Sequence, residues 1–377
     1  MSMSSLALQS FHETLGGRFT PVGGALVVEH YGDPEAEHAA LRQSAAVLDL
    51  SCRSRLCVVG GDRERFLNGQ VTNNVKALSV GEGCYAAVVN ARGRMQSDAN
   101  IYRLAEECLL DFEPGLSAGI ARRLEQYVVA DDVQIVDVAA DYGLLSVQGP
   151  QAATVLRQAV LLEAPAPTTS RTAPSAELPT QPLHIRPVLH PGWGELYVAH
   201  HARTGTTGFD LFVPVAALRP AAESLVQAAR DHGGRPAGWT ALEIGRVEAG
   251  RPRFGADMDE TTLPIEAGIE ARAISYRKGC YIGQEIIARL HAHGRLAKSL
   301  CGLRLADAVA ALPRTGDRLL WRDREVGHVT TAVTSPALRA NLALGYVRRE
   351  AQMSGEALRV QGLAGDDVAH VVALPFG

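Results

Sequence analysis

The chain has 377 residues, of which 46% are hydrophobic and 21% charged, and its formal net charge is −4. This length exceeds what one hydrophobic core usually supports, so we expect two or three domains. The acidic balance offers no basic surface for nucleic acid, no apolar run could span a bilayer, and the first residues lack signal-peptide features. Composition therefore predicts a cytoplasmic protein without nucleic-acid or membrane partners.

The first third of the chain reads as strands. Apolar runs separated by turn residues predict strands over 55–60, 84–90, 94–104 and 107–113, with a hairpin around "NARG". The six cysteines are scattered and form no C-x-x-C pair, so no zinc or iron–sulfur site is encoded locally. Cys57 and Cys108 lie inside strand-like runs and are expected to be small buried hydrophobes.

Asp98 interrupts one of these strands. A carboxylate is disfavoured inside a strand unless it faces water or a partner. Strand alternation places Asp98, Asn100 and Tyr102 on one face, and Ala99 and Ile101 on the other. The polar strip either faces solvent or lines a cavity, and spacing leaves both interpretations open.

Residues 115–119, "GLSAG", match the G-x-S-x-G nucleophile elbow of esterases. Pro114 precedes the first glycine and no glycine-rich oxyanion segment lies upstream. These features favour the other interpretation, in which Ser117 is the N-cap of a helix that begins at Ala118.

The middle of the chain alternates between strands, helices and one long irregular stretch. The expected elements are a strand over 144–150, a helix over 151–160, a Pro/Thr-rich surface loop over 163–191, a strand over 208–214, and helices over 216–234 and 239–252. Thr240 and Glu243 have the spacing of a capping box. Arg246, on the last helix, is by default an exposed helix arginine.

Short apolar runs with frequent glycine and proline begin near residue 295 and predict a small antiparallel β-barrel. His291 and His293 alternate as in a strand and are expected at a solvated approach to the barrel rather than on a metal. The acidic stretch "GADMDET" lacks the spacing of a calcium loop and reads as a polar loop. No metal site is predicted.

The segment "RKGCYIGQE", residues 277–285, places Cys280 in polar company. Arg277 and Lys278 could lower the pKa of this thiol and so favour a thiolate, which is both a nucleophile and a soft metal ligand. Alternatively, Cys280 occupies a tight turn and packs under the barrel. The residues alone do not separate these possibilities.

Several segments, taken in order, resemble one family over nearly the whole chain. They are "FLNGQVTNNV" (66–75), "CYAAVVNARGRMQSDANIY" (84–102), "LLSVQGP" (144–150), "RTGTTGFDLFVP" (203–214) and "ALEIGRVEAGRPRFGADMDETTLPIEAG" (241–268). Together they resemble the folate-binding aminomethyltransferase of the glycine cleavage system, the T-protein. The resemblance implies an α+β fold of three domains in a ring around a central tetrahydrofolate channel. The domains would be 1–48 plus 143–232, 49–142 plus 233–288, and a C-terminal antiparallel β-barrel over 289–377.

The segment "KGCYIGQE" resembles the signature of one branch of this superfamily, the YgfZ-type folate-binding proteins. T-proteins tend to carry a "GDFIGKE"-like segment there. The branch is implicated in assembly, maintenance or repair of iron–sulfur enzymes, including tRNA-modifying ones. The implied motif residues are Lys278, Gly279, Cys280, Tyr281, Gly283, Gln284 and Glu285.

The resemblance also assigns site residues. Asp98 matches an acidic residue near the reactive nitrogens of folate, where a carboxylate can exchange a proton with an amine. Tyr85 matches a tyrosine that lines the folate channel, and Asn90 matches a neighbouring turn asparagine. Arg246 matches an arginine that contacts folate, and Asp210 stands where T-proteins usually have glutamate. In addition, "RTGTTGFD" is shorter than their "RTGYTGEDGFE".

These implications lead to one leading hypothesis and two alternatives. The leading hypothesis is a tetrahydrofolate-binding protein that supports iron–sulfur client or assembly proteins, with Cys280 and Asp98 as its functional residues. One alternative is a folate-dependent aminomethyltransferase that acts on a lipoyl carrier protein. The other is a non-catalytic folate-binding scaffold, so enzymatic activity is left open.

Overall fold

The computed structural model describes residues 6–160, 177–306, 309, 311–362 and 365–376. It contains two compact units. The first comprises Met1–Leu67, Val75–Tyr85 and Ala99–Leu242, and the second comprises Asn68–Asn74, Ala86–Asp98 and Glu243–Gly377. The chain passes from one unit to the other five times, after Leu67, Asn74, Tyr85, Asp98 and Leu242.

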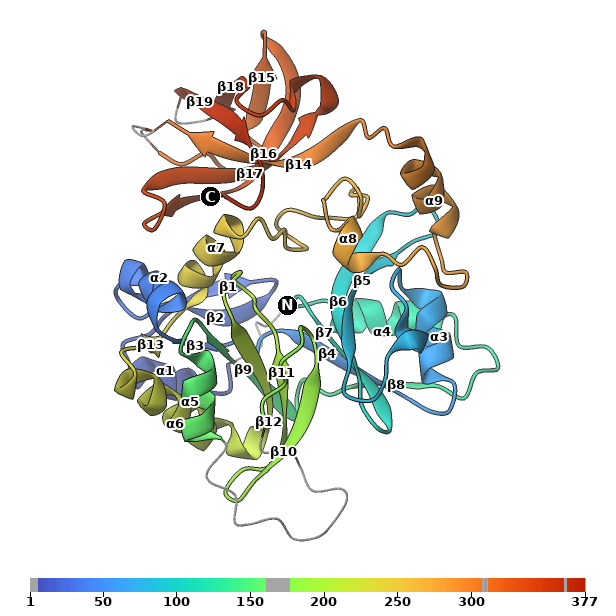
Figure 1. Cartoon of the computed structure of the whole chain (residues 1–377), viewed down its shortest axis with the longest axis vertical. Helices are drawn as coiled ribbons and strands as arrows, with labels where there is room; N and C mark the ends of the chain where they lie inside the picture. The colour runs from blue at the N-terminus through green and yellow to red at the C-terminus, as the bar shows by residue number, and fades with distance from the viewer. Residues whose placement is uncertain (1–5, 161–176, 307–308, 310, 363–364, 377) are drawn as a thin grey trace. The chain divides into compact units, whose positions relative to one another are not determined.

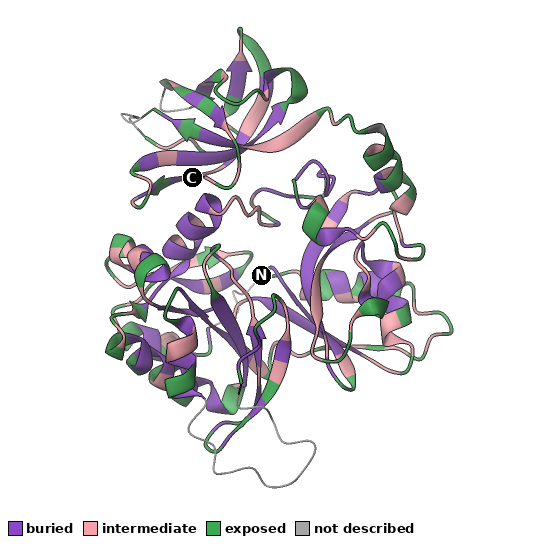
Figure 2. Ribbon diagram, viewed as in Figure 1, coloured by how far each residue is buried: buried purple, intermediate pink, exposed green. Residues whose placement is uncertain are grey.

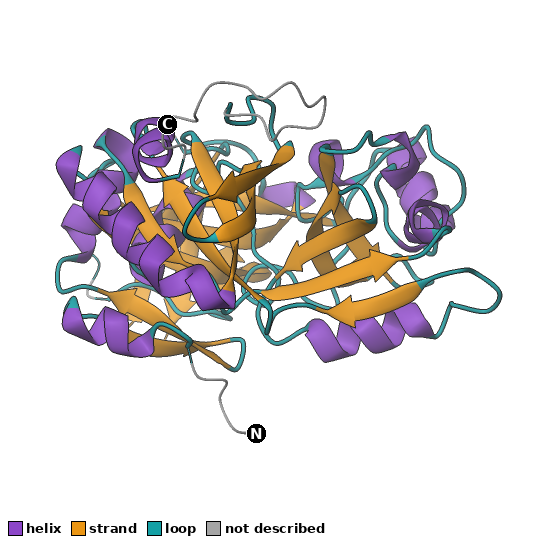
Figure 3. Ribbon diagram, turned by 90° about the horizontal axis from the view of Figure 1, so that it is seen from below, coloured by secondary structure: helices purple, strands orange, loops and turns teal. Residues whose placement is uncertain are grey.

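The first unit contains a six-stranded sheet in the order β10-β11-β12-β9-β3-β13. Its strands are β3 (Ala46–Asp49), β9 (Tyr142–Gln148), β10 (Ile185–His190), β11 (Gly194–His200), β12 (Gly208–Pro214) and β13 (Arg235–Pro236). Neighbouring strands run antiparallel except β13 and β3. Helices α5 (Ala152–Ala159) and α6 (Leu218–Asp231) cover one face of this sheet (Figure 1). Figure 3, a view from below coloured by secondary structure, shows helices beside the strands.

A five-stranded sheet has the order β5-β6-β7-β4-β8. Its strands are β4 (Ser54–Val59), β5 (Gly83–Val89), β6 (Met95–Arg103), β7 (Glu107–Phe112) and β8 (Gln134–Asp137). Within the first unit, Tyr102 and Leu109 of this sheet pack against Leu144 and Phe212 of the six-stranded sheet. Strands β9 and β12 are therefore covered on both faces, and nearly all of their residues are buried (Figure 2).

Shorter elements complete the first two-thirds of the chain. They are α1 (Gln9–Thr14), the hairpin β1 (Arg18–Val22) and β2 (Ala25–His30), α2 (Pro34–Gln43), α3 (Arg63–Gln70), η1 (Val75–Ala77), α4 (Ser117–Glu125), η2 (Val215–Ala217) and α7 (Trp239–Glu248). Helix α2 begins as expected from its sequence, because the Asp33 side chain accepts a hydrogen bond from the Ala36 amide and Pro34 occupies the first turn.

The second unit contains a closed barrel in the order β14-β17-β16-β15-β18-β19. Its strands are β14 (Lys298–Leu305), β15 (Arg318–Trp321), β16 (Arg324–Ser335), β17 (Ala340–Arg348), β18 (Ala357–Gly362) and β19 (Gly365–Val372), with η3 (Arg349–Ala351) after β17. Helices α8 (Glu270–Ala273) and α9 (Gln284–His293) precede it. The predicted α+β fold with a C-terminal antiparallel barrel is confirmed, as are the predicted strands of the first third.

Four local predictions are wrong. His291 and His293 lie on helix α9, not on a strand. Helix α7 begins at Trp239, so Thr240 lies inside its first turn and forms no capping box. Helix α4 begins at Ser117, which is therefore not its N-cap. The predicted 163–191 loop contains β10, whereas its residues 163–176 lie outside the described residues.

Candidate functional site

Asp98 lies on β6 with only 9% of its surface exposed, so the solvent-facing interpretation of the polar strip is wrong. Asn100 is also buried, and Tyr102 is fully so. Tyr85 is half-buried on β5, which neighbours β6 in the sheet. Burying a carboxylate on a strand is costly unless it has hydrogen-bond or ion-pair partners, and this cost makes Asp98 a candidate for a functional role.

Asn90 shapes the turn between β5 and β6. Its side-chain oxygen accepts hydrogen bonds from the backbone amides of Arg92 and Arg94, at 2.9 and 3.1 Å. The turn is also the place where the "KGCYIGQE" motif approaches the hairpin. A Cβ atom at Gly283 would lie 2.5 Å from the Asn90 carbonyl oxygen, and Gly283 has a φ of +80°. Only glycine satisfies both conditions.

Arg246 is buried, so its default assignment as an exposed helix residue is wrong. Its Nε and Nη2 atoms donate to the two oxygens of Glu243, at 2.9 and 2.7 Å. Nη1 donates to Asp257 at 2.6 Å and to the Arg251 carbonyl at 3.0 Å, and Nη2 also donates to Thr331 at 3.2 Å. All five donors of the guanidinium therefore have partners within the protein.

Electrostatics explain why this arginine tolerates burial. Burial alone would lower the pKa of Arg246, but the Asp257 and Glu243 carboxylates raise it above its usual range. Asp257 also accepts hydrogen bonds from the hydroxyls of Thr330 and Thr331 on β16, at 2.6 and 2.7 Å. Arg246 and Asp257 together therefore connect helix α7 to the barrel wall within the second unit.

Asp210 belongs to a second buried network, in the first unit. Its carboxylate accepts hydrogen bonds from His201 Nδ1 at 2.8 Å and from Arg203 Nη2 at 2.7 Å. Arg203 reaches onward to Asp111 at 3.1 Å, and Asp111 in turn accepts from Arg53 Nε at 2.7 Å. Burial opposes ionisation of Asp210, but Arg203 and His201 hold its pKa well below the usual range.

Asp111, His201 and Asp210 have ligand atoms within 4.8 Å of one another, close enough to share a metal ion. The same carboxylate oxygens already accept hydrogen bonds from Arg203 and Arg53. A cation placed there would face two guanidinium groups, so we assign the cluster to an ion-pair network. Sequence reasoning found only Asp210; the carboxylate inside the apolar run "CLLDF" was the signal for Asp111.

Lys278 anchors the "KGCYIGQE" motif. Its ammonium donates to the carbonyl oxygens of Asn68, Val71 and Asn73 at 2.5, 2.7 and 2.6 Å. It also lies 4.9 Å from the ring centroid of Tyr281. The lysine thus fixes the motif to the 68–74 segment through donors that a neutral side chain could not replace.

Cys280 is exposed, so the alternative in which it packs under the barrel is wrong. Gly279 is also exposed, and no heavy atom lies within 4 Å of a Cβ built on it. Gln284 begins helix α9, and its side-chain oxygen accepts a hydrogen bond from the Tyr281 amide at 3.3 Å; Glu285 is exposed in the same turn. The thiol is thus presented on a segment anchored on both sides.

The fold defines an α+β protein with a closed C-terminal barrel, and comparison with known families makes the assignment specific. Residues 8–278 match the GCVT N-terminal domain, and residues 298–376 match the glycine cleavage T-protein C-terminal barrel domain. The chain belongs to the GCVT family.

Relatives match along the full length. The aminomethyltransferase of Saccharopolyspora erythraea is 30% identical over 371 residues, covering 98% of this chain and 96% of the relative. That of Ralstonia pickettii is 31% identical over 393 residues, covering 100% of this chain and 98% of the relative. The crystal structure of glycine cleavage system aminomethyltransferase T from Bartonella henselae has the same fold, with a TM-score of 0.85 and 23% identity over 100% of this chain and 98% of that one.

The predicted superfamily is thus confirmed, whereas the YgfZ branch, its iron–sulfur partners and the site residues stay predictions. The names of these relatives agree with the aminomethyltransferase alternative rather than the leading hypothesis. Among the helices that the structure describes, none has the length and apolarity needed to cross a membrane.

Proposed function

We propose that this chain is a cytoplasmic tetrahydrofolate-binding aminomethyltransferase. The observation that carries the proposal is the match to aminomethyltransferases over nearly the full length of both chains. The proposal replaces the iron–sulfur hypothesis as the leading one. The donor would be an aminomethyl-lipoyl carrier protein.

Two of the residues expected to contact folate have surroundings that fit this role, and two others do not. Asp98 is a buried carboxylate, and Tyr85 offers a half-buried aromatic ring on the neighbouring strand. Arg246 and Asp210, by contrast, are held by protein partners. We therefore assign folate contact to Asp98 and Tyr85, and a positioning role to Arg246 and Asp210.

Bound tetrahydrofolate would supply the amine nitrogens that accept the one-carbon unit. The part of this chain is to orient the reacting amine and to hold or move a proton at the Asp98 carboxylate, a role that typically contributes about 10²–10⁴-fold in rate. Asn90 supports that role indirectly, because it fixes the turn that joins β5 to β6.

The test is methylene-tetrahydrofolate formation from a loaded lipoyl carrier protein. Asp98→Asn should lower the rate at least about 10²-fold while tetrahydrofolate still binds. Asp323→Asn is the matched control, because the Asp323 side chain is 89% exposed on the barrel. Unchanged activity in Asp98→Asn would remove Asp98 from the chemistry, and absence of product with wild type would reject the proposal.

The second candidate is the predicted support of iron–sulfur enzymes. It is favoured by one specific observation, the exposed Cys280 on a segment anchored by Lys278. Complementation of a strain that lacks its own copy separates the two functions, with an iron–sulfur enzyme as the readout. If Cys280→Ala fails to restore the iron–sulfur enzyme while its aminomethyl transfer is intact, the second function is established. If Cys280→Ala restores the enzyme fully, the Cys280 thiol has no part in it.

A further inference from the structure

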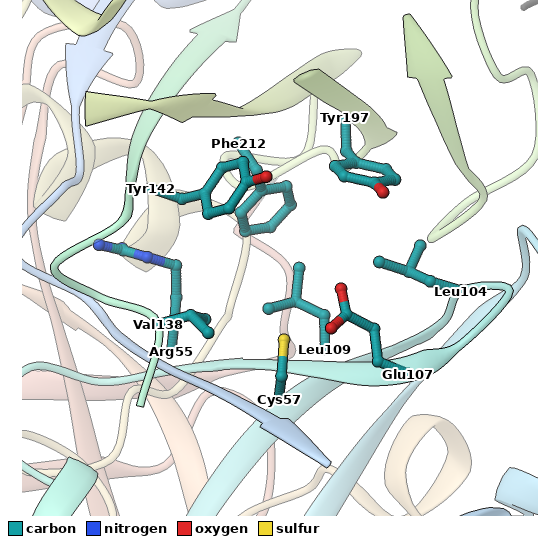
Figure 4. A pocket seen from close by; sticks show the side chains of 9 residues that line it. All are labelled: Arg55, Cys57, Leu104, Glu107, Leu109, Val138, Tyr142, Tyr197 and Phe212. Atoms are coloured by element: carbon teal, nitrogen blue, oxygen red, sulfur yellow. The ribbon is translucent and has the colours of Figure 1, made fainter. Parts of the chain in front are cut away.

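A cavity of about 150 Å³ lies in the first unit, between residues of its two sheets, and its walls are largely aromatic (Figure 4). Tyr142, Tyr197 and Phe212 line it from strands β9, β11 and β12. Leu104 and Leu109 add apolar side chains. Both tyrosines are only half-buried, so part of each is in contact with solvent. None of these residues is among the predicted folate or motif residues.

Glu107 brings a negative charge to the cavity. It is half-buried on β7, and Figure 4 shows its carboxylate directed toward the tyrosine rings. The Cys57 thiol is hydrogen-bonded to this carboxylate, and burial together with Glu107 raises the pKa of the thiol, so Cys57 stays neutral. A carboxylate has about four lone-pair positions, so one bond from a neutral thiol leaves its charge in place.

A second carboxylate lies beside the same rings. Glu195 is exposed, and it accepts a hydrogen bond from the Tyr197 hydroxyl at 2.8 Å. Burial, this hydrogen bond and the charges of Glu195 and Glu107 raise the pKa of Tyr197. Burial and the same two carboxylates also raise the pKa of Tyr142. Both phenols are therefore neutral, and both rings lie in a negative potential.

Arg55 also lines the cavity, but its charge is not available to a ligand. The side chain is fully buried, and its Nη atoms donate to three backbone carbonyls at 2.9, 3.1 and 3.2 Å. Burial lowers the pKa of Arg55, whereas the Asp111 and Asp49 carboxylates raise it and so offset its charge. Figure 4 shows the guanidinium at the edge of the group, on the side away from Glu107.

We propose that this cavity binds a quaternary ammonium group, such as the trimethylammonium end of a small molecule. Such a group carries a charge but no N–H, so it needs aromatic faces and a negative potential rather than a set of hydrogen-bond acceptors. Tyr142, Tyr197 and Phe212 provide the faces, and Glu107 provides the charge. The group fits the volume, because a cavity of this size accommodates benzene, with about six non-hydrogen atoms.

Ligands of other kinds match the cavity less well. An anion would meet the Glu107 carboxylate. A primary ammonium would leave N–H donors unpaired against the aromatic and leucine side chains. A neutral molecule of the same shape would gain the apolar contacts but nothing from the negative potential.

The experiment is calorimetric titration of the full chain with choline, dimethylbutanol and ethanolamine. Dimethylbutanol is the isostere of choline in which carbon replaces the nitrogen, so it has the shape without the charge. Ethanolamine has the charge without the methyl groups. Choline should bind at least about tenfold more tightly than either of the other two.

Substitutions then test the individual walls. Tyr197→Leu removes an aromatic face and should weaken choline binding at least about fivefold, whereas Tyr197→Phe keeps the face and should bind like wild type. Glu107→Gln should weaken binding at least about tenfold. Glu106→Gln, at the exposed neighbouring position, is the matched control and should leave the affinity unchanged. Thermal unfolding checks that each variant is folded.

Three results would overturn the proposal: no heat with choline up to millimolar concentrations, binding of dimethylbutanol or ethanolamine as tight as that of choline, or equal choline affinity in Glu107→Gln and wild type. The first two results come from the wild-type chain, so they hold even if a variant fails to fold. Binding in this cavity is independent of the proposed aminomethyl transfer, because none of the lining residues is assigned to that reaction.

Discussion

Arginine side chains show, residue by residue, how this protein stabilises charge in its interior. Arg203 and Arg246 donate to carboxylates in geometries that use several of their hydrogens. Arg55 is equally buried, but its Nη atoms donate to backbone carbonyls rather than to carboxylates. Removing one carboxylate from either of the first two leaves a buried charge with less compensation, which costs more stability than the pair itself contributes.

Asp210→Asn tests this asymmetry. The substitution leaves Arg203 buried with less compensation, so we expect the free energy of unfolding to fall by about 3–5 kcal/mol. Urea denaturation measures the change. Glu223→Gln breaks the exposed pair with Arg219 and should cost less than about 1 kcal/mol. Equal costs for the two variants would contradict the assignment of a buried network.

The same network predicts acid sensitivity. Arg203 and His201 lower the pKa of Asp210, and Arg53 and Arg203 lower that of Asp111, in both cases against the effect of burial. Their stabilisation is therefore complete above the unfolded value of about 3.9 and is lost as pH falls below it. Burial and Arg203 also lower the pKa of His201, so the unfolded state gains a proton first below about pH 6.5.

Unfolding free energies measured across a pH series should thus decline below about pH 6.5 and more steeply below about pH 4. The steep part should be smaller in Asp210→Asn, because that variant no longer carries the titrating carboxylate. A wild-type stability that stays constant from neutral pH to pH 3 would refute this account.

Residue type and position identified Asp98 as unusual, because a carboxylate inside a strand needs a reason, whereas Asp210 was singled out only by the family resemblance. The same reasoning could not supply their partners. Arg53 and Asp111 are 58 positions apart, and Arg203 and Asp111 are 92 apart. Their pairing follows from how strands β4, β7 and β12 come together, which no local pattern contains.

Among the elements, helix α9 shows how a motif can depend on backbone conformation. Its N-cap, Gly283, and its C-cap, Gly294, both have left-handed φ values, +80° and +61°. They differ in surroundings. A Cβ at Gly283 would meet the Asn90 carbonyl at 2.5 Å, whereas nothing lies within 4 Å of one at Gly294. Comparing alanine substitutions at these two glycines therefore separates the energetic cost of the left-handed backbone conformation from the cost of the steric contact.

We expect Gly283→Ala to destabilise the protein by at least about 1 kcal/mol more than Gly294→Ala. Both variants carry the left-handed penalty of about 1–2 kcal/mol, but only the first forces the β5–β6 turn away from the helix. Thermal and urea unfolding provide the comparison. Equal losses of stability in the two variants would show that the backbone at Asn90 moves away from the new Cβ atom at no energetic cost.

Prediction of helices and strands succeeded where the apolar periodicity was clear and failed near the ends of these elements. Helix α6 and strand β12 follow their patterns because each buries a continuous apolar set. The alternation of His291 and His293 was misleading because two residues at the end of α9 carry no periodicity of their own. The β10–β11 hairpin was missed because Pro187 and Pro191 resemble loop signals.

For the molecule as a whole, the division into units does not follow the chain. Segments 68–74 and 86–98 belong with residues beyond 242. The Thr72 hydroxyl donates to the Ala273 carbonyl at 2.6 Å, and the Met95 amide donates to the Thr262 carbonyl at 3.0 Å. No single cut therefore yields two complete pieces.

A fragment that ends at residue 242 should lose these partners and fail to melt cooperatively, although it retains both sheets in sequence. Near-ultraviolet circular dichroism during heating would detect the loss of fixed aromatic packing. Addition of a 243–377 fragment should restore part of the signal. Cooperative melting of the first fragment alone, at the temperature of the full chain, would contradict the interleaved arrangement.

The interleaving also has a consequence for biosynthesis. Thr72 and Ala273 are 201 positions apart, so at roughly 5–20 residues per second the ribosome takes roughly 10–40 s to deliver the second after the first. During that interval the 68–74 and 86–98 segments lack the residues that cover them in the finished fold. Nascent chains of this protein should consequently be clients of the chaperones that shield newly made, unpaired strands.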